Sequence, residues 1–360
     1  MKVALVYDRV NKWGGAERVL LALHELFPDA PLYTSVYNAE TAPWAKVFTV
    51  RTSFLQHFPF AKSSHELYAL FMPLVFESFS FDEFDTVISI TSEAAKGIIT
   101  KPGTRHICYC LTPTRYLWSG YSEYFANYVL KFVSFPLISY LRFWDKISGS
   151  RPDQFVAISR EVQKRISTYY KKDAVVIYPP VTLGTRYKVD TKAKKKQKQD
   201  YFLIVSRLVS YKRIDLAIEA CNRLKLPLKI VGTGMQEEYL KSIAGETIEF
   251  LGRLTDEQII GYYCECTALL FPGSEDFGLT ILEAQSFGKP VIAYKAGGAL
   301  ETIREGKTGE FFFPQTSAAL ERKLEKFKQN KYNSRDSIDQ AKKFDKKQFF
   351  KQMQAILTNK

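Results

Sequence analysis

The feature that most constrains the fold is an alternation of strands and helices that runs twice along the chain. In the first series, a helix is expected over Ala16–Leu26. The strands expected in this series are Lys2–Tyr7, Leu32–Val36, Val87–Ile90, Arg105–Cys110, Phe155–Ile158 and Ala174–Tyr178. Alternation of this kind is typical of a parallel sheet with helices on both faces.

The alternation stops at Pro179–Pro180 and begins again at Tyr201. The second series is expected to contain the strands Tyr201–Ser206, Leu228–Val231, Ile248–Leu251, Ala268–Phe271 and Pro290–Ala293. We therefore predict an α/β protein with two Rossmann-like, doubly wound parallel-sheet domains, residues 1–180 and 181–335, facing each other across a cleft. The basic tail, residues 336–360, is predicted to be a helix that crosses back to the N-terminal domain.

The composition narrows the choice of partners. The chain has 51 Lys and Arg against 38 Asp and Glu, a net charge of +13, which suits nucleic acid, an anionic membrane or phosphorylated small molecules. Seven of the basic residues lie in Arg186–Lys198, which is either a solvated linker or a binding segment. The five cysteines lack disulfide or zinc-knuckle spacing, so we expect a reduced compartment and no metal site.

The termini and apolar segments indicate where the protein acts. The N-terminus begins with a strand instead of a signal peptide, and no apolar stretch reaches the ~20 residues that span a bilayer. We expect a cytoplasmic protein.

The segment from Gly273 to Glu283 carries the most informative pattern, because it follows a strand and opens a helix. The backbone N–H groups of Phe277, Gly278 and Leu279 would lie at a helix N-terminus, which favours a diphosphate. Glu283, one turn inside the helix, could accept the ribose hydroxyls, and Glu275 could reach the sugar. Two glutamates eight residues apart also occur by chance, so the intervening Phe-Gly-Leu is needed to support this hypothesis.

Two cations follow the first strand of the second series. Arg207 and Lys212 would face the diphosphate at the carboxyl edge of the sheet. Departure of a nucleoside diphosphate builds negative charge, which fixed cations stabilise. With Glu275 they form the predicted catalytic set, although two surface cations beside a helix remain the simpler alternative.

Further donor-binding candidates are Gly14, Gly15, Gly232 and Arg253. The paired glycines follow the first strand and would let the backbone approach a phosphate. They are not the spaced glycines of nicotinamide enzymes, so hydride transfer is disfavoured. Gly232 follows a strand of the second series, where an ordinary turn explains it equally well.

Together these motifs resemble glycosyltransferase family 4, which contains retaining enzymes of GT-B fold, and most of all its mannosyltransferase-like members in bacterial surface polysaccharide synthesis. The resemblance covers nearly the whole chain. It rests on Gly14–Arg18, Tyr109–Trp118, Tyr178–Val181, Ser206–Asp215 and Glu275–Glu283.

The resemblance implies a function and a role for each candidate residue. It implies a retaining hexosyltransferase that needs no cofactor or metal and uses a nucleotide diphosphate sugar, with GDP-mannose favoured and a UDP-sugar as an alternative. It also implies that Gly15 lies by the donor phosphates, Arg207 and Lys212 clamp them, Glu275 and the amides of Phe277–Leu279 hold the sugar, and Glu283 holds the ribose.

One segment departs from the family pattern. Similar proteins commonly carry His where this chain has Leu111, and in them that His reaches the donor sugar near its 6-hydroxyl. Leu111 therefore implies either a 6-deoxyhexose donor or a compromised site. Leu111, Thr112 and Arg115 are the predicted residues of the acceptor or sugar side.

Aromatic and basic residues mix between Tyr116 and Trp144. This mixture suits a bilayer interface. It favours an anionic membrane surface as a partner and a polyprenyl-linked or saccharide acceptor, with the protein peripheral on the inner face of the cell membrane. The alternative is that these residues pack inside the protein.

Two other functions stay open. An epimerase or phosphorylase of similar fold is one possibility. A non-catalytic nucleic-acid-binding protein would explain the charge but not Glu275 and Glu283, so nucleic acid is not an expected partner.

Overall fold

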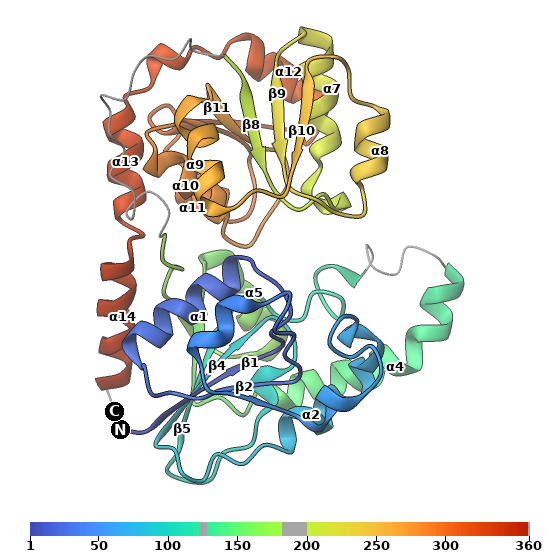
Figure 1. Ribbon diagram of the computed structural model, residues 1–360, viewed down its shortest axis with the longest axis vertical. Coiled ribbons are helices and arrows are strands. Elements are labelled where there is room, and N and C mark those ends of the chain that lie inside the picture. The colour runs from blue at the N-terminus through green and yellow to red at the C-terminus, as the bar shows by residue number, and fades with distance from the viewer. Residues whose placement is uncertain (122–127, 182–199, 359–360) are drawn as a thin grey trace. The chain divides into compact units, whose positions relative to one another are not determined.

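The computed structural model describes residues 1–121, 128–181 and 200–358, which form two compact units, Met1–Tyr178 and Pro179–Lys360 (Figure 1). The lysine-rich run Arg186–Lys198 and residues 122–127 of the aromatic span lie outside the described residues.

The N-terminal unit contains a seven-stranded parallel sheet in the order β3-β2-β1-β4-β5-β6-β7. Its strands are β1 (Val3–Tyr7), β2 (Leu32–Thr34), β3 (Val50–Thr52), β4 (Thr86–Thr91), β5 (Arg105–Cys110), β6 (Gln154–Ala157) and β7 (Ala174–Val176). The sequence pattern predicts all of these except β3, a three-residue edge strand that is only partly buried. The chain leaves β1 toward β2 and returns to β4 on the other side of β1, so the switch point of this sheet lies between β1 and β4.

Helices and 3₁₀ turns connect these strands. They are α1 (Gly15–Leu26), η1 (Pro43–Val47), η2 (Phe54–His57), η3 (His65–Phe71), α2 (Met72–Glu77), η4 (Ala95–Gly97), α4 (Tyr128–Ser148) and α5 (Arg160–Tyr170). One core cluster joins strand residues such as Ala4 and Val87 to Met72 and Phe76 of η3–α2 and to Trp144 of α4. Helix α4 therefore packs against η3 and α2.

The C-terminal unit contains a six-stranded parallel sheet in the order β10-β9-β8-β11-β12-β13. Its strands are β8 (Phe202–Val205), β9 (Leu228–Val231), β10 (Ile248–Gly252), β11 (Ala268–Phe271), β12 (Val291–Tyr294) and β13 (Gly309–Phe312). Its helices are α7 (Ile214–Leu224), α8 (Glu237–Ser242), α9 (Asp256–Glu265), α10 (Leu279–Ser286), α11 (Ala299–Thr302), α12 (Ser317–Glu325), α13 (Ser334–Lys342) and α14 (Lys346–Thr358), with 3₁₀ turns η5 (Ser210–Lys212) and η6 (Gln329–Lys331).

Alternate strand residues of this unit point into two separate cores. Ile204 and Leu270 belong to a cluster with α7, whereas their neighbours Leu203 and Leu269 belong to a cluster with α9 and α10. Figure 1 accordingly shows α7, α8 and α12 on one side of the sheet and α9, α10 and α11 on the other. The predicted doubly wound arrangement is confirmed, because successive strand side chains alternate between the two faces.

The tail is helical, as expected. The amide of Gln340 in α13 donates to the carbonyl of Thr302 at 3.4 Å, and the backbone N–H of Val181 donates to the carbonyl of Phe344 at 2.9 Å. Residues 336–360 fall within the C-terminal unit. Their crossing back to the N-terminal domain stays a prediction.

Candidate active site

The loops after β8 and β11 carry the predicted catalytic residues. These strands are neighbours, and the chain continues from them toward opposite edges of the sheet, to β9 and to β12. Ligands of open α/β sheets bind at the carboxyl ends of strands at such a switch point. Lys212 ends η5 after β8, and its Nζ forms an ion pair with Oε1 of Glu275 in the loop after β11. The Lys212 side chain is 11% exposed and that of Glu275 is 23% exposed.

Gly273 lets these two loops approach each other. A Cβ atom there would lie 2.8 Å from Cα and 2.9 Å from the carbonyl oxygen of Lys212, closer than real Cβ contacts. Any other residue at position 273 would push the loop away from Lys212. The sequence pattern includes Gly273 but does not show this close contact.

Tyr211 connects the two predicted cations. Its hydroxyl accepts a hydrogen bond from Nη2 of Arg207 at 2.8 Å, and Nζ of Lys212 lies 5.3 Å from the centre of its ring. Arg207, Lys212 and Glu275 are thus grouped at one edge of the C-terminal sheet, as an anion clamp requires.

Helix α10 begins beside Glu275. Gly278 is its N-cap with φ 85°, a left-handed conformation that suits glycine, and no side chain caps the first turn. One turn further, Glu283 is 6% exposed, and its Oε2 accepts a hydrogen bond from the hydroxyl of Tyr263 at 2.8 Å. The buried tyrosine fixes the direction of this carboxylate beside the helix N-terminus.

The loop after β12 packs against the backbone of Glu275 and Phe277. This contact was not predicted from the sequence. The backbone N–H of Gly298 donates to the carbonyl of Glu275 at 2.8 Å. A Cβ at Gly297 would overlap that carbonyl, and a Cβ at Gly298 would overlap Cα of Phe277. A glycine pair after a strand, as at Gly14–Gly15, is the sequence signal that could have revealed this support.

Gly232 and Arg253 lie on the other side of β8. Gly232 has φ 132°, and a Cβ there would overlap the carbonyl of Ser206, so glycine is needed where the loops after β8 and β9 meet. Arg253 is exposed and follows β10, the edge strand two positions from β8. The structure gives Gly232 a backbone role, whereas its donor-binding role and that of Arg253 stay predictions.

In the N-terminal unit, Gly14 is the N-cap of α1, and no side chain caps that helix. The buried Glu17 in the first turn accepts a hydrogen bond from the hydroxyl of Tyr7 at 2.7 Å. A Cβ at Gly14 would lie 3.1 Å from Oε2 of Glu17. A carboxylate therefore already lies near this helix N-terminus, and binding of donor phosphates at Gly14 and Gly15 stays a prediction.

Asp8 connects the ends of β1 and β4, the two strands at the switch point of the N-terminal sheet. It was not predicted as a site residue from the sequence. It follows β1 and is 2% exposed. Its carboxylate accepts backbone N–H groups of four successive residues after β4, Ser92 to Ala95, at 2.7–3.0 Å. Burial is the main cause that raises the pKa of Asp8, and the negative charge of Glu93 raises it further. Asp8 fixes the loop after β4.

That loop carries an ion pair. Nη1 of Arg9 lies 2.6 Å from Oε1 of Glu93, and Nε2 of the buried His65 lies 3.6 Å from Oε2. Burial opposes ionisation of Glu93, but Arg9 and then His65 outweigh it and lower the pKa of Glu93 to about 2. Glu93 thus stays charged at neutral pH.

The predicted sugar-side residues follow β5, at the same edge of the N-terminal sheet. Leu111 and Arg115 are half-buried, and Thr112 is buried. Nη1 of Arg165 donates to Oγ1 of Thr112 at 3.4 Å. The structure thus gathers Leu111, Thr112 and Arg115 in one turn segment, and their contact with a sugar stays a prediction.

Large apolar side chains are exposed on α4 and on η3–α2. They are Phe132, Val133, Phe135, Leu137, Tyr140, Phe143 and Ile147 on α4, and Leu67, Leu70, Phe71 and Leu74 on η3–α2. We call these residues the apolar face. Apolar side chains exposed singly are normal, whereas several along one helix indicate an interaction surface. No helix in the part of the chain that the structure describes is long and apolar enough to cross a membrane.

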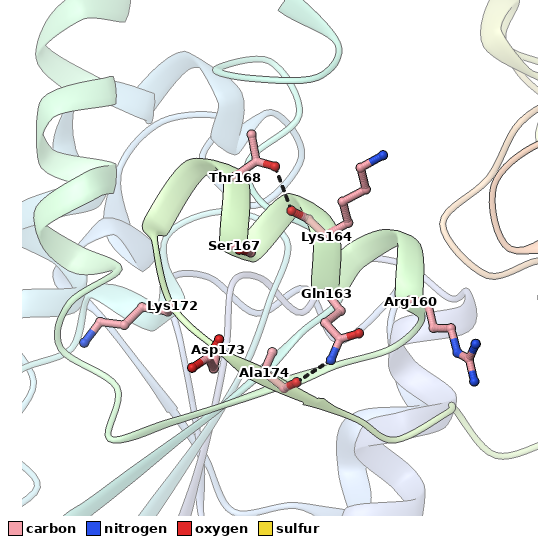
Figure 2. Close-up of a pocket in the computed structure, with 8 residues that line it drawn as sticks. All are labelled: Arg160, Gln163, Lys164, Ser167, Thr168, Lys172, Asp173 and Ala174. Carbon is pink, nitrogen blue, oxygen red and sulfur yellow. Dashed lines mark hydrogen bonds between the residues drawn. The ribbon is translucent and has the colours of Figure 1, made fainter.

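Two hollows lie away from the predicted site residues. The first, of about 350 Å³, lies along α5 and β7; its lining includes Arg160, Lys164, Lys172 and Asp173 (Figure 2). Figure 2 also shows the amide of Gln163 donating to the carbonyl of Ala174, at 2.7 Å. The second, of about 340 Å³, lies beside β13 and α12. We place the candidate donor site at the switch point of the C-terminal sheet, because Arg207, Lys212 and Glu275, the residues suited to diphosphate chemistry, are grouped there. The described residues contain no group of three or more His, Cys, Asp or Glu side chains suited to a metal ion.

Comparison with known proteins gives independent information on the C-terminal unit. Residues 186–344 match the family model of glycosyl transferases group 1. The chain is 32% identical to the O-antigen chain mannosyltransferase C of Escherichia coli over 129 residues, which cover 34% of this chain and 35% of that protein. It is also 32% identical to the D-rhamnosyltransferase WbpZ of Pseudomonas aeruginosa over 128 residues, which cover 33% of this chain and 34% of that one. Several further relatives are named mannosyltransferases.

The fold has a match over the full length. The crystal structure of Anabaena HepE in complex with UDP-glucose superposes with a TM-score of 0.74 at 19% identity and covers 100% of both chains. In contrast, the chain spans 58% of the length of its Methanocaldococcus jannaschii relative, an uncharacterized glycosyltransferase, and about a third of the two named above. The chain has the α/β GT-B fold of two Rossmann-like domains, and residues 186–344 carry its similarity to glycosyl transferases group 1.

Proposed function

We propose that this protein is a retaining, metal-independent glycosyltransferase that moves a hexose from a nucleoside diphosphate sugar to a saccharide or lipid-linked acceptor in polysaccharide synthesis. The contact between Lys212 and Glu275 at the switch point of the C-terminal sheet carries the proposal. It places a cation and a carboxylate side by side at the start of α10, where a charged diphosphate and a hydroxyl-rich sugar need opposite partners.

The resemblance to glycosyltransferase family 4 implies the course of the reaction. The bond between the anomeric carbon and the diphosphate breaks, the acceptor oxygen bonds to that carbon, and the acceptor proton passes to a phosphate oxygen of the leaving group. Arg207 and Lys212 stabilise the charge that builds on the diphosphate. When the diphosphate engages Lys212, the Glu275 carboxylate is released to accept sugar hydroxyls, and Glu283 accepts those of the ribose.

GDP-mannose is the favoured donor, because several relatives are mannosyltransferases. Leu111 favours a second candidate, a 6-deoxyhexose donor, because an apolar side chain suits a methyl group better than a hydroxymethyl group. The similarity to a D-rhamnosyltransferase supports this candidate, since rhamnose is a 6-deoxyhexose. HepE was crystallised with UDP-glucose, which keeps UDP-sugars among the donors to be tested.

The apolar face supports an anionic membrane surface as a partner. Phe132 is 76% exposed and Phe143 is 66% exposed. Helix α4 also carries the cations Lys131, Arg142 and Lys146. Its acidic residue, Asp145, is buried against Lys96, so it does not neutralise their positive charge at the surface. Exposed aromatic rings with basic neighbours bind the headgroup region of anionic bilayers, and we place the protein at the inner face of the cell membrane.

The test begins with donor binding. Thermal shifts with GDP-mannose, GDP-rhamnose and UDP-glucose identify the donor, and the triple variant Arg207→Ala/Lys212→Ala/Glu275→Ala should lose the shift. Release of nucleoside diphosphate should require an acceptor such as octyl α-mannoside and should persist in EDTA, and the product should keep the anomeric configuration of the donor, as seen by NMR. Salt-sensitive RNA binding without any shift by a sugar nucleotide would refute the proposal.

A further inference from the structure

One carboxylate inside the N-terminal unit collects hydrogen bonds from three other parts of the chain. Asp145 of α4 is 1% exposed. Its Oδ1 accepts from Nζ of Lys96 at 2.5 Å and from Oγ1 of Thr114 at 2.9 Å. Its Oδ2 accepts from Nε1 of Trp118 at 2.7 Å and from the hydroxyl of Tyr170 at 2.9 Å. A buried carboxylate costs several kcal/mol unless such donors satisfy it.

Two of these four donors belong to the segment that carries the predicted sugar-side residues. Thr114 and Trp118 lie in 111–118, a run of bends and turns that follows β5. Within the segment, the N–H groups of residues 117 and 118 donate to the carbonyl of Thr114 at 3.1 Å. The N–H of Leu111 donates to the carbonyl of Thr91 at 2.8 Å. Beyond this bond the segment has no regular secondary structure, so side-chain contacts contribute to its position.

Helix α4 supplies further contacts to the same segment. Nε of Arg142 donates to the carbonyl of Leu117 at 2.7 Å, and the Leu117 side chain packs with Ile138 and Leu141. The guanidinium of Arg142 also lies 5.7 Å from the centre of the Trp118 ring. Asp145 is the charged centre of this contact between α4 and the segment.

We infer that Asp145 is a positioning residue that, through Thr114 and Trp118, fixes segment 111–118 against α4 and so holds the predicted sugar-side residues Leu111, Thr112 and Arg115 in position. If Asp145 served only to neutralise the buried Lys96, no donor from the segment would be needed. The role in sugar transfer rests on the proposed function, whereas the fixing of the segment does not.

A matched pair of variants tests the inference on the full chain. Trp118→Phe removes a donor that comes from the segment and keeps a ring beside Tyr169, on which Trp118 now stacks at 5.0 Å. Tyr170→Phe removes a donor to the same oxygen, but from α5. Loss of a hydrogen bond to a charged group weakens a contact about tenfold or more, so Trp118→Phe should raise amide hydrogen exchange at Thr112 and in residues 114–118 by about that factor. Tyr170→Phe should leave that exchange within about twofold.

Thr114→Val serves as a second variant, in case Trp118→Phe does not fold, and carries the same expectation. If the segment variants and Tyr170→Phe change the exchange equally, or none of them changes it, Asp145 does not position the segment.

An activity assay adds the functional readout. With GDP-mannose and octyl α-mannoside as probes, Trp118→Phe or Thr114→Val should lower kcat/KM about tenfold, because the predicted sugar-side residues lose their position, and should leave the affinity for free GDP unchanged, because GDP carries no sugar. A fall in kcat alone, in step with a lower melting temperature, would show a merely structural role. If the wild type turns over none of the donors tested, the proposed function fails, while the exchange comparison still decides the role of Asp145.

Discussion

The ammonium group of Lys212 contacts the carboxylate of Glu275, although 62 residues of sequence separate them. They meet because β8 and β11 are adjacent strands and Gly273 leaves room for the backbone of Lys212. In the proposed reaction the diphosphate takes the place of Glu275 as the partner of Lys212. The pair thus keeps a cation and a carboxylate balanced in the absence of substrate and provides a separate partner for each part of the donor.

Lys212→Gln should therefore lower the transfer rate by about 10²–10³-fold, because one fixed donor to a developing charge is worth that much. Steady-state kinetics with the preferred donor measure the loss. Arg213→Gln is the matched control, since Arg213 pairs with Asp215 and not with Glu275, and it should stay within about threefold of the wild type. An equal loss in both variants would mean that general positive charge, and not the Lys212 contact, supports the reaction.

Glu283→Gln should weaken binding of the free nucleoside diphosphate about tenfold, because a neutral amide accepts the ribose hydroxyls less strongly than a carboxylate. Tyr263→Phe keeps the carboxylate and removes only the hydrogen bond that orients it, so its effect should be smaller. Isothermal titration calorimetry with GDP and UDP measures both. Wild-type affinity in Glu283→Gln would remove Glu283 from the nucleotide site.

The sequence analysis anticipated both series of alternating elements, because buried parallel strands such as Val3–Tyr7 and Ala268–Phe271 are continuous apolar runs. The pattern does not reveal β3 and β13, the outer strands Val50–Thr52 and Gly309–Phe312, because Arg51 interrupts the first and Gly309 and Glu310 leave only two apolar residues in the second. It selected Lys212 and Glu275 as separate residues. Their ion pair and the four backbone hydrogen bonds to Asp8 depend on strand order and backbone proximity, which sequence spacing does not encode.

Leu111→His should change the choice of sugar. An imidazole can hydrogen-bond a 6-hydroxyl, whereas leucine offers only apolar contact, so the variant should shift the ratio of kcat/KM for GDP-mannose over GDP-rhamnose about tenfold toward GDP-mannose. Competition assays with both donors measure the ratio. An unchanged ratio would show that residue 111 does not contact the sugar.

Glu93 should give the N-terminal unit a measurable acid sensitivity. Its pKa is about 2 in the folded protein and near 4.5 in an ordinary glutamate, so the unfolded chain takes up the proton first as the pH falls. The stabilisation is complete above pH 4.5 and is lost toward pH 2. Urea unfolding at pH 6 and pH 3 should therefore show that the wild type loses about 2 kcal/mol more than Glu93→Gln over this interval. Parallel losses in the two proteins would contradict the depressed pKa.

The apolar face should decide binding to anionic lipid. Phe132→Ser/Phe135→Ser/Phe143→Ser removes three exposed rings, each of which can insert into the headgroup region. The variant should cosediment at least about tenfold less than the wild type with vesicles of phosphatidylcholine and phosphatidylglycerol. Met235→Ser/Tyr239→Ser removes exposed apolar side chains of the C-terminal unit and should bind like the wild type.

Lipid charge separates the two contributions to binding. Because Lys131 and Lys146 add an electrostatic component, vesicles of phosphatidylcholine alone should bind the wild type weakly. Equal binding to both vesicle types would leave the apolar contribution but exclude attraction to anionic lipid, and undiminished binding of the triple variant would exclude α4 as the contact.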